Sequence, residues 1–117
     1  MATFVLVHGA WHGGWCWSRV APRLRAAGHS VFTPTMTGLG ERSHLLTADV
    51  GLETNVTDIM NVLQWEDLNE VILVAQSYAG MVTTSVADRL PERIGALIYI
   101  NAFIPDDGIS QNDMLPD

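Results

Sequence analysis

Short apolar runs rich in β-branched residues alternate along the chain with segments of helical periodicity. The apolar runs cover residues 3–7, 29–33, 71–75 and 94–102. Short runs that are apolar throughout are typical of strands buried on both faces of a sheet. Strands that are separated by helical segments form parallel sheets with right-handed crossovers. The pattern therefore predicts an α/β fold with a doubly wound, mostly parallel sheet of about four strands.

Two of the expected helices lie in the middle of the chain. In residues 55–65, apolar side chains follow the i, i+3, i+4, i+7 spacing of one helix face. Residues 81–90 form the other, and Pro91 ends it. The stretch 35–52 follows neither period, and a connection of that length is usually functional or lid-like.

A further helix is expected near the start of the chain, over residues 19–27. Ser18 is the expected N-cap, and Gly28 stands at the favoured C-terminal position. Val20 and Leu24 fall on one face of this helix. That face is expected to pack on the sheet.

One serine stands between the strand at 71–75 and the helix at 81–90. A strand, a tight turn with a serine and a helix together lift a nucleophile to the end of a parallel sheet. The usual pattern is G-x-S-x-G, but here Ala75 and Ala79 flank Ser77 in place of the glycines. The alternative interpretation is a buried strand followed by a helix that Ser77 merely caps.

Composition and charge narrow the function classes. The 117 residues amount to one domain or less, and 48% hydrophobic residues indicate a globular chain. No run approaches the roughly 20 apolar residues of a membrane span, and there is no basic leader of a secretory signal. Six basic and thirteen acidic residues give a net charge of -7, which argues against nucleic-acid binding. We expect a cytoplasmic protein with no nucleic-acid or membrane partner.

No pattern for a metal or cofactor is present. Cys16 is the single cysteine, and no Cys/His spacing resembles a zinc site. We expect Cys16 to be a small buried hydrophobe rather than a reactive thiol. Neither a G-x-G-x-x-G fingerprint nor a phosphate-binding loop is present. The sequence implies no cofactor.

The predicted layers are incomplete. Only four strands are expected, and residues 103–117 are polar and add neither a strand nor a helix. A parallel sheet needs both faces covered and its edges protected. The pattern therefore indicates that the chain forms about half of a domain.

Three stretches together resemble the α/β-hydrolase superfamily. They are residues 5–15 (VLVHGAWHGGW), 75–80 (AQSYAG) and 96–105 (ALIYINAFIP). Within the superfamily the chain is most similar to the group of plant methylesterases and hydroxynitrile lyases, with their bacterial esterase relatives. The resemblance covers the family's N-terminal half. It implies that residues 1–117 are the first part of one domain, with 103–117 leading towards the lid.

The resemblance implies roles for the positions that match the family motifs. Ser77 matches the nucleophile, and the backbone N–H groups of Ala10 and Tyr78 match the oxyanion hole. Lyases of the group have a hydroxyl side chain at the position of Gly9, whereas the esterases have glycine. Gly9 therefore favours ester hydrolysis.

The substrate pocket is expected around the same motifs, with Gly9, Trp11, His12 and Gln76 as its candidate residues. Trp15 and Trp17 belong to the same aromatic loop. Packing of the first helix onto the sheet is at least as good an interpretation for these two tryptophans.

The chain lacks the other members of a catalytic triad. In this superfamily the order is Ser, acid, His, but His8, His12, His29 and His44 all precede Ser77. A serine hydroxyl without a base is a poor nucleophile at neutral pH. On the family pattern the acid and the histidine lie beyond residue 117, in a complementary C-terminal polypeptide or a longer chain. A lesser alternative is that His8 or His12 acts as the base.

The sequence thus predicts part of a serine carboxylic-ester hydrolase that acts on a small-molecule ester through an acyl-enzyme. One alternative is hydroxynitrile lyase-like cleavage of a carbon–carbon bond. Another is a catalytically incompetent fragment or binding module that keeps the fold without the chemistry.

Overall fold

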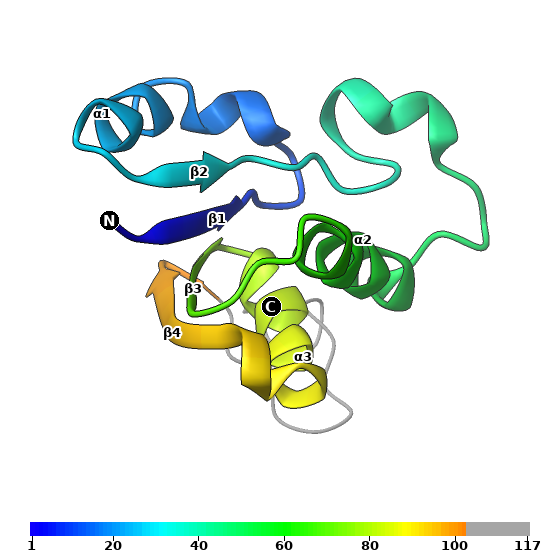
Figure 1. The fold of residues 1–117 in the computed structure, drawn as a ribbon. Helices are drawn as coiled ribbons and strands as arrows, with labels where there is room; N and C mark the ends of the chain where they lie inside the picture. Colours follow the sequence, from blue (N-terminus) through cyan, green and yellow to red (C-terminus); the bar gives the residue numbers. More distant parts are fainter. Residues whose placement is uncertain (103–117) are drawn as a thin grey trace.

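The computed structural model describes residues 1–102, whose strands form one parallel sheet in the order β2-β1-β3-β4 (Figure 1). Each connection between successive strands contains a helix, as parallel pairing requires. The predicted α/β, doubly wound parallel sheet is confirmed. Its strands are β1 (Thr3–Val7), β2 (Ser30–Phe32), β3 (Val71–Gln76) and β4 (Ile94–Ile100).

Helices cover both faces of the sheet. Helix α1 lies on one face, and α2 and α3 lie on the other (Figure 1). Short 3-10 helices occupy the loops after β1, β2 and α3. The helices are α1 (Ala21–Ala26), α2 (Leu52–Trp65), α3 (Ala79–Arg89), η1 (Gly14–Trp17), η2 (Gly40–Leu45) and η3 (Pro91–Arg93).

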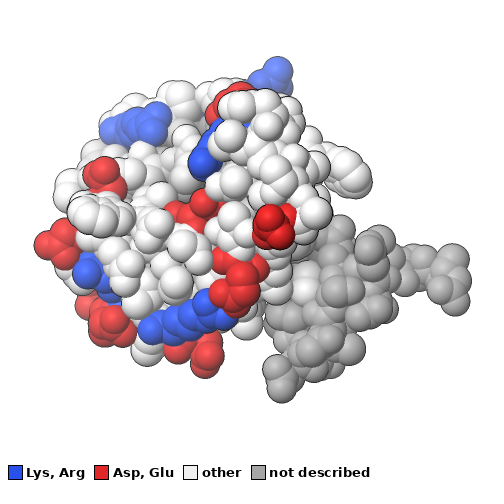
Figure 2. Space-filling model, turned by 90° about the vertical axis from the view of Figure 1, so that its right-hand side faces the viewer, with Lys and Arg blue, Asp and Glu red and all other residues white. Residues whose placement is uncertain are grey.

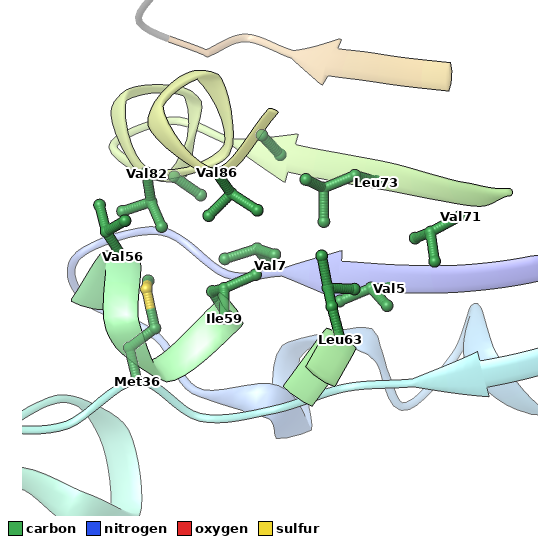
Figure 3. Close-up of a cluster of buried hydrophobic side chains, with 12 residues drawn as sticks. Val5, Val7, Met36, Val56, Ile59, Leu63, Val71, Leu73, Val82 and Val86 are labelled. Carbon is green, nitrogen blue, oxygen red and sulfur yellow. The ribbon is translucent and has the colours of Figure 1, made fainter. Parts of the chain in front are cut away.

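The larger core cluster lies between the sheet and helices α2 and α3 (Figure 3). Because side chains alternate along a strand, every second residue of β1 and β3 points into it. Helix α2 contributes the face predicted from the sequence. The fully buried side chains include Val5, Val7, Val71, Leu73, Val56, Ile59 and Leu63.

A smaller cluster lies on the opposite face of the sheet. Leu6 and Val74 point into it from β1 and β3, and Trp17 and Ala21 cover them. Cys16 packs against this cluster and is half-buried, as expected of a small hydrophobe. Burial raises the pKa of its thiol, which disfavours the reactive thiolate.

The first helix departs from its prediction. Residues 14–17 wind into η1, and α1 begins only at Ala21. Ser18 follows η1 as its C-terminal residue, so its predicted role as the N-cap of α1 is wrong. Val20 is 43% exposed instead of packing on the sheet, because the buried positions are taken by Trp17 and Ala21.

Other element bounds differ by a few residues. Helix α2 starts at Leu52 because the N–H of Gly51 donates to Thr54 Oγ1 at 3.1 Å, which supports an earlier first turn. Helix α3 starts at Ala79, two residues before the predicted 81. Strand β4 ends at Ile100 rather than at 102.

Strand β4 stands at one edge of the sheet. Its Leu97 and Tyr99 pack against the larger core cluster, whereas Ile98 and Ile100 are 43% and 44% exposed. Within residues 1–102 no strand pairs with its outer edge. The expected course of 103–117 towards a lid lies outside the described residues.

Charged side chains are scattered over the surface. On the face shown in Figure 2, acidic and basic side chains are interspersed, with no continuous basic area. No helix in the described part of the chain is long and apolar enough to cross a membrane.

Candidate active site

Ser77 stands in a two-residue turn between β3 and α3. Its φ angle is 55°, in the left-handed region that a residue with a Cβ rarely adopts. The N–H of Ser77 donates to the carbonyl of Ile100 at the end of β4 (3.3 Å), and the N–H of Gly80 donates to the carbonyl of Ser77 (3.0 Å). This is the sharp strand-to-helix turn that places a serine hydroxyl at the end of a sheet.

The two alanines that replace the usual glycines are compatible with this turn. Ala75 and Ala79 are fully buried in the larger core cluster, where their β-carbons add to the packing. Tyr78, not Ser77, occupies the N-cap position of α3, and no side chain caps that helix end. The alternative interpretation of Ser77 as a helix cap is therefore wrong.

Gly9, in the loop after β1, lies directly against this turn. A β-carbon added to Gly9 would stand 3.2 Å from Ser77 Cβ and 3.4 Å from the carbonyl oxygen of Gln76. The contact arises because Val7 and Ala75 pair in neighbouring parallel strands, so both loops leave the same edge of the sheet. The structure thus brings together three of the predicted site residues, Gly9, Gln76 and Ser77.

The two backbone N–H groups expected to bind an oxyanion flank this contact. Ala10 follows Gly9, and Tyr78 follows Ser77. Among residues 1–102, neither N–H has a hydrogen-bond acceptor. Free amide donors beside a serine hydroxyl can stabilise a developing negative charge.

His8 is fully buried and holds the loop after β1 in place. Its Nδ1–H donates to the carbonyl oxygen of Gly9 (2.7 Å), and its Nε2 accepts from the N–H of Met36 (3.0 Å). Burial lowers the pKa of His8, an effect opposed by the Gly9 hydrogen bond and the charge of Glu41 and reinforced by His12. His8 is therefore a neutral structural residue with no free nitrogen for proton transfer.

The side chain of Tyr78 ties the serine turn to α2. Its hydroxyl donates to Asn55 Oδ1 at 2.9 Å, and Asn55 Nδ2 donates to the carbonyl of Thr37 at 3.1 Å. Asp58 accepts hydrogen bonds from the N–H and the hydroxyl of Thr37, at 2.6 and 2.8 Å. Burial, and then the charge of Asp58, raise the pKa of Tyr78 to about 12, so it remains a hydroxyl donor. Asn55, Asp58 and Thr37 stand in no motif that marks them as site residues in the sequence.

The aromatic residues of the loop after β1 divide between solvent and core. Trp11 is 88% exposed, and Trp15 is 54% exposed with its ring edge-on to His12 at 5.8 Å between centroids. Trp17 packs in the smaller core cluster, as the packing interpretation predicted. Trp11, a candidate residue of the substrate pocket, is therefore open to solvent.

No histidine in the described part of the chain is hydrogen-bonded to Ser77. His8 is held by backbone groups on both sides, and His29 Nδ1 accepts from the N–H of Ala2. No cluster of three possible metal ligands occurs among the described residues 1–102. This part of the chain therefore presents a serine and amide donors without a base.

The left-handed backbone of Ser77 predicts that a glycine at this position makes the protein more stable to unfolding than an alanine does. Ser77→Gly removes the β-carbon that disfavours φ of 55°, whereas Ser77→Ala keeps it. We expect Ser77→Gly to be about 1 kcal/mol more stable to urea unfolding than Ser77→Ala. Equal stability of the two variants would show that the turn is not strained at this residue.

Burial of neutral His8 predicts a loss of stability in acid. Its native pKa lies below the ordinary value of about 6.5, so an unfolded chain binds a proton that the native state resists. The contribution of His8 is full above pH 6.5 and declines as the pH falls towards the lowered pKa. Urea titrations between pH 7.5 and 5 should show a shallower decline for His8→Gln than for the unmodified protein. An unchanged slope in His8→Gln would contradict the assignment.

Comparison with known proteins places this geometry in a family. Residues 4–117 match the Alpha/beta hydrolase family. The chain is 53% identical over 116 residues to a carbendazim hydrolyzing esterase of Nocardioides sp. (strain SG-4G), covering 99% of this chain and 48% of that protein. It is 37% identical to Methylesterase 7 and 36% identical to an alpha-hydroxynitrile lyase, both of Arabidopsis thaliana, covering 88% of this chain and 40% of each of those proteins.

A solved structure agrees with the fold. An extracellular α/β-hydrolase from a Paenibacillus species, with structural and functional homology to tobacco salicylic acid binding protein 2, superimposes with a TM-score of 0.91 at 34% identity. The match covers 99% of this chain and 47% of that one. The chain thus spans about half the length of the relatives it matches, and the resemblance inferred from its motifs is confirmed. The chain belongs to the alpha/beta hydrolase family, and the similar proteins include esterases.

Proposed function

We propose that this chain supplies the nucleophile and the oxyanion hole of a serine carboxylic-ester hydrolase. The observation that supports this best is the left-handed turn at Ser77 packed against Gly9. A serine at the end of β3, beside two amide donors without acceptors among residues 1–102, has the groups that acyl transfer requires.

In the proposed reaction, Ser77 Oγ attacks the carbonyl carbon of the ester and gives its proton to a base. The carbonyl oxygen becomes an oxyanion that accepts hydrogen bonds from the N–H groups of Ala10 and Tyr78. The N-terminal end of α3 adds the positive end of a helix dipole. Collapse of the intermediate expels the alcohol, which takes the proton, and water then hydrolyses the acyl-enzyme.

We propose that a C-terminal part, in the same polypeptide or a separate one, provides the acid and the histidine. None of the histidines in the described part of the chain is hydrogen-bonded to Ser77, and the chain spans about half the length of its relatives. The exposed Ile98 and Ile100 on β4 offer an apolar face for further elements of the same domain. Residues 1–117 then constitute the first part of one domain.

Gly9 favours ester hydrolysis over the lyase reaction. A β-carbon at this position would already stand 3.2 Å from Ser77 Cβ, so any larger side chain would project over the nucleophile. With glycine, that space is open to an ester group. Because a similar esterase is named for hydrolysing carbendazim, carbendazim is a suitable first substrate to test.

Serine-directed labelling tests the proposal. We expect a fluorophosphonate to label Ser77 when a C-terminal part is present, and native mass spectrometry should show the mass increment on the polypeptide that contains residues 1–117. If the C-terminal part is a separate polypeptide, the labelled species should contain both polypeptides. Ser77→Ala should abolish the increment. Ser85→Ala, which removes a serine hydroxyl bonded to the carbonyl of Met81, should retain it.

Two outcomes would contradict the proposal. The first is labelling that persists in Ser77→Ala. The second is an assembly that cleaves mandelonitrile but releases no nitrophenol from p-nitrophenyl acetate, which would assign the site to the lyase reaction.

A further inference from the structure

We infer that His8, Asn55 and Tyr78 are positioning residues that fix the two oxyanion-binding amides relative to each other. The inference rests on the proposed function, because it concerns the same amides of Ala10 and Tyr78. It goes further by assigning a role to a buried hydrogen-bonded path that joins the two loops through α2 and the segment after β2.

Each of the two amide N–H groups shares a peptide unit with the carbonyl of the preceding residue, and that carbonyl accepts hydrogen bonds from other groups of the protein. A peptide unit is planar, and these are trans, so its C=O and N–H point in opposite directions. The carbonyl of Gly9 accepts from His8 Nδ1–H at 2.7 Å and from the N–H of His12 at 3.2 Å. These bonds fix the direction of the N–H of Ala10, because that N–H shares the peptide plane with the Gly9 carbonyl.

The second amide is fixed in the same way. The carbonyl of Ser77 accepts from the N–H of Gly80 at 3.0 Å, which orients the N–H of Tyr78 in the opposite direction. Tyr78 has an additional anchor, because its own side-chain hydroxyl donates to Asn55 Oδ1. The residue that supplies the donor is thus held at both its backbone and its side chain.

A continuous path joins the two anchors. From Tyr78 it passes through the side-chain amide of Asn55 to the carbonyl of Thr37. The adjacent Met36 donates its N–H to His8 Nε2, and His8 Nδ1–H reaches Gly9. Every link is between 2.7 and 3.1 Å long.

Burial gives the path its rigidity. His8 and Met36 are fully buried, and Asn55 is only 4% exposed. A buried polar group that loses its partner costs about 1–3 kcal/mol, so these side chains have few alternative positions. Asp58 holds the N–H and the hydroxyl of Thr37 and thereby fixes the middle of the path. The spacing of the two amides is therefore set by these hydrogen-bonded side chains.

Tyr78→Phe tests this role, because it removes only the hydroxyl that begins the path. Removal of a whole oxyanion-hole donor slows catalysis by about 100- to 1,000-fold, so a misplaced donor should cost about 10-fold. We expect the maximal rate of fluorophosphonate labelling of the assembled protein to fall about 10-fold. The reagent concentration at half-maximal rate should not change, since that depends on binding before the oxyanion forms.

Tyr99→Phe is the matched control. Its hydroxyl is bonded to Thr84 Oγ1 at 2.8 Å, so the variant also loses a half-buried tyrosine hydrogen bond, but outside the path. It should label at the unmodified rate. Asn55→Ala interrupts the path at its centre and should slow labelling as Tyr78→Phe does. The double variant of Tyr78 and Asn55 should be no slower than the slower single variant, because both remove one path.

The outcomes separate this inference from the proposed function. If the unmodified assembly is not labelled at Ser77, the proposed function fails and the positioning role fails with it. If the unmodified assembly is labelled, and Tyr78→Phe and Asn55→Ala react as fast as Tyr99→Phe, the function stands and the positioning role is wrong. Multiplicative losses in the double variant would also overturn the single path.

Discussion

The left-handed backbone of Ser77 is the constraint on which the site depends. A residue with a Cβ pays about 1–2 kcal/mol for this conformation, so the surrounding structure must impose it. Here β3 fixes the chain before the serine and α3 fixes it after the serine. The carbonyl of Ile100, at the end of β4, accepts a hydrogen bond from the N–H of Ser77. Ala75 and Ala79, on either side of the turn, are fully buried.

The parallel pairing of β1 and β3 then determines which loop lies beside Ser77. Strands β1 and β3 are neighbours in register, so the loop after β1 leaves the sheet beside the turn after β3. The close approach of Gly9 to Ser77 follows from this arrangement and from the absence of a side chain at position 9. His8, the first residue after β1, anchors that loop because its Nε2 accepts a hydrogen bond from the backbone N–H of Met36. The fold thus places amide donors around a hydroxyl, and the base that we propose lies in another part of the domain.

Much of this architecture could be predicted from the sequence, for identifiable reasons. The buried strands are apolar throughout, and α2 has a regular apolar face, so both kinds of element are encoded in local patterns. The start of α1 could not be predicted, because Ser18 has the character of a helix cap but the chain first forms η1 to bury Trp17. Only the tertiary structure decides between these two local options.

The path from Tyr78 to His8 is not predictable from the sequence, for a different reason. Its long-range links join residues that are 23, 18 and 28 positions apart, each through a single hydrogen bond, and no periodic pattern in the sequence indicates such links. Asn55 could have been noticed as a polar residue at a buried helical position, but its partners could not. The site roles of Gly9 and Ser77, in contrast, are implied by the family resemblance of the motifs in which these residues stand.

The most direct test of the central claim is a crystal structure of the assembled protein with a phosphonate bound to Ser77. The account predicts that the phosphoryl oxygen lies about 2.7–3.1 Å from the backbone nitrogens of both Ala10 and Tyr78. An adduct whose phosphoryl oxygen points away from these two amides, or one bonded to a residue other than Ser77, would contradict it.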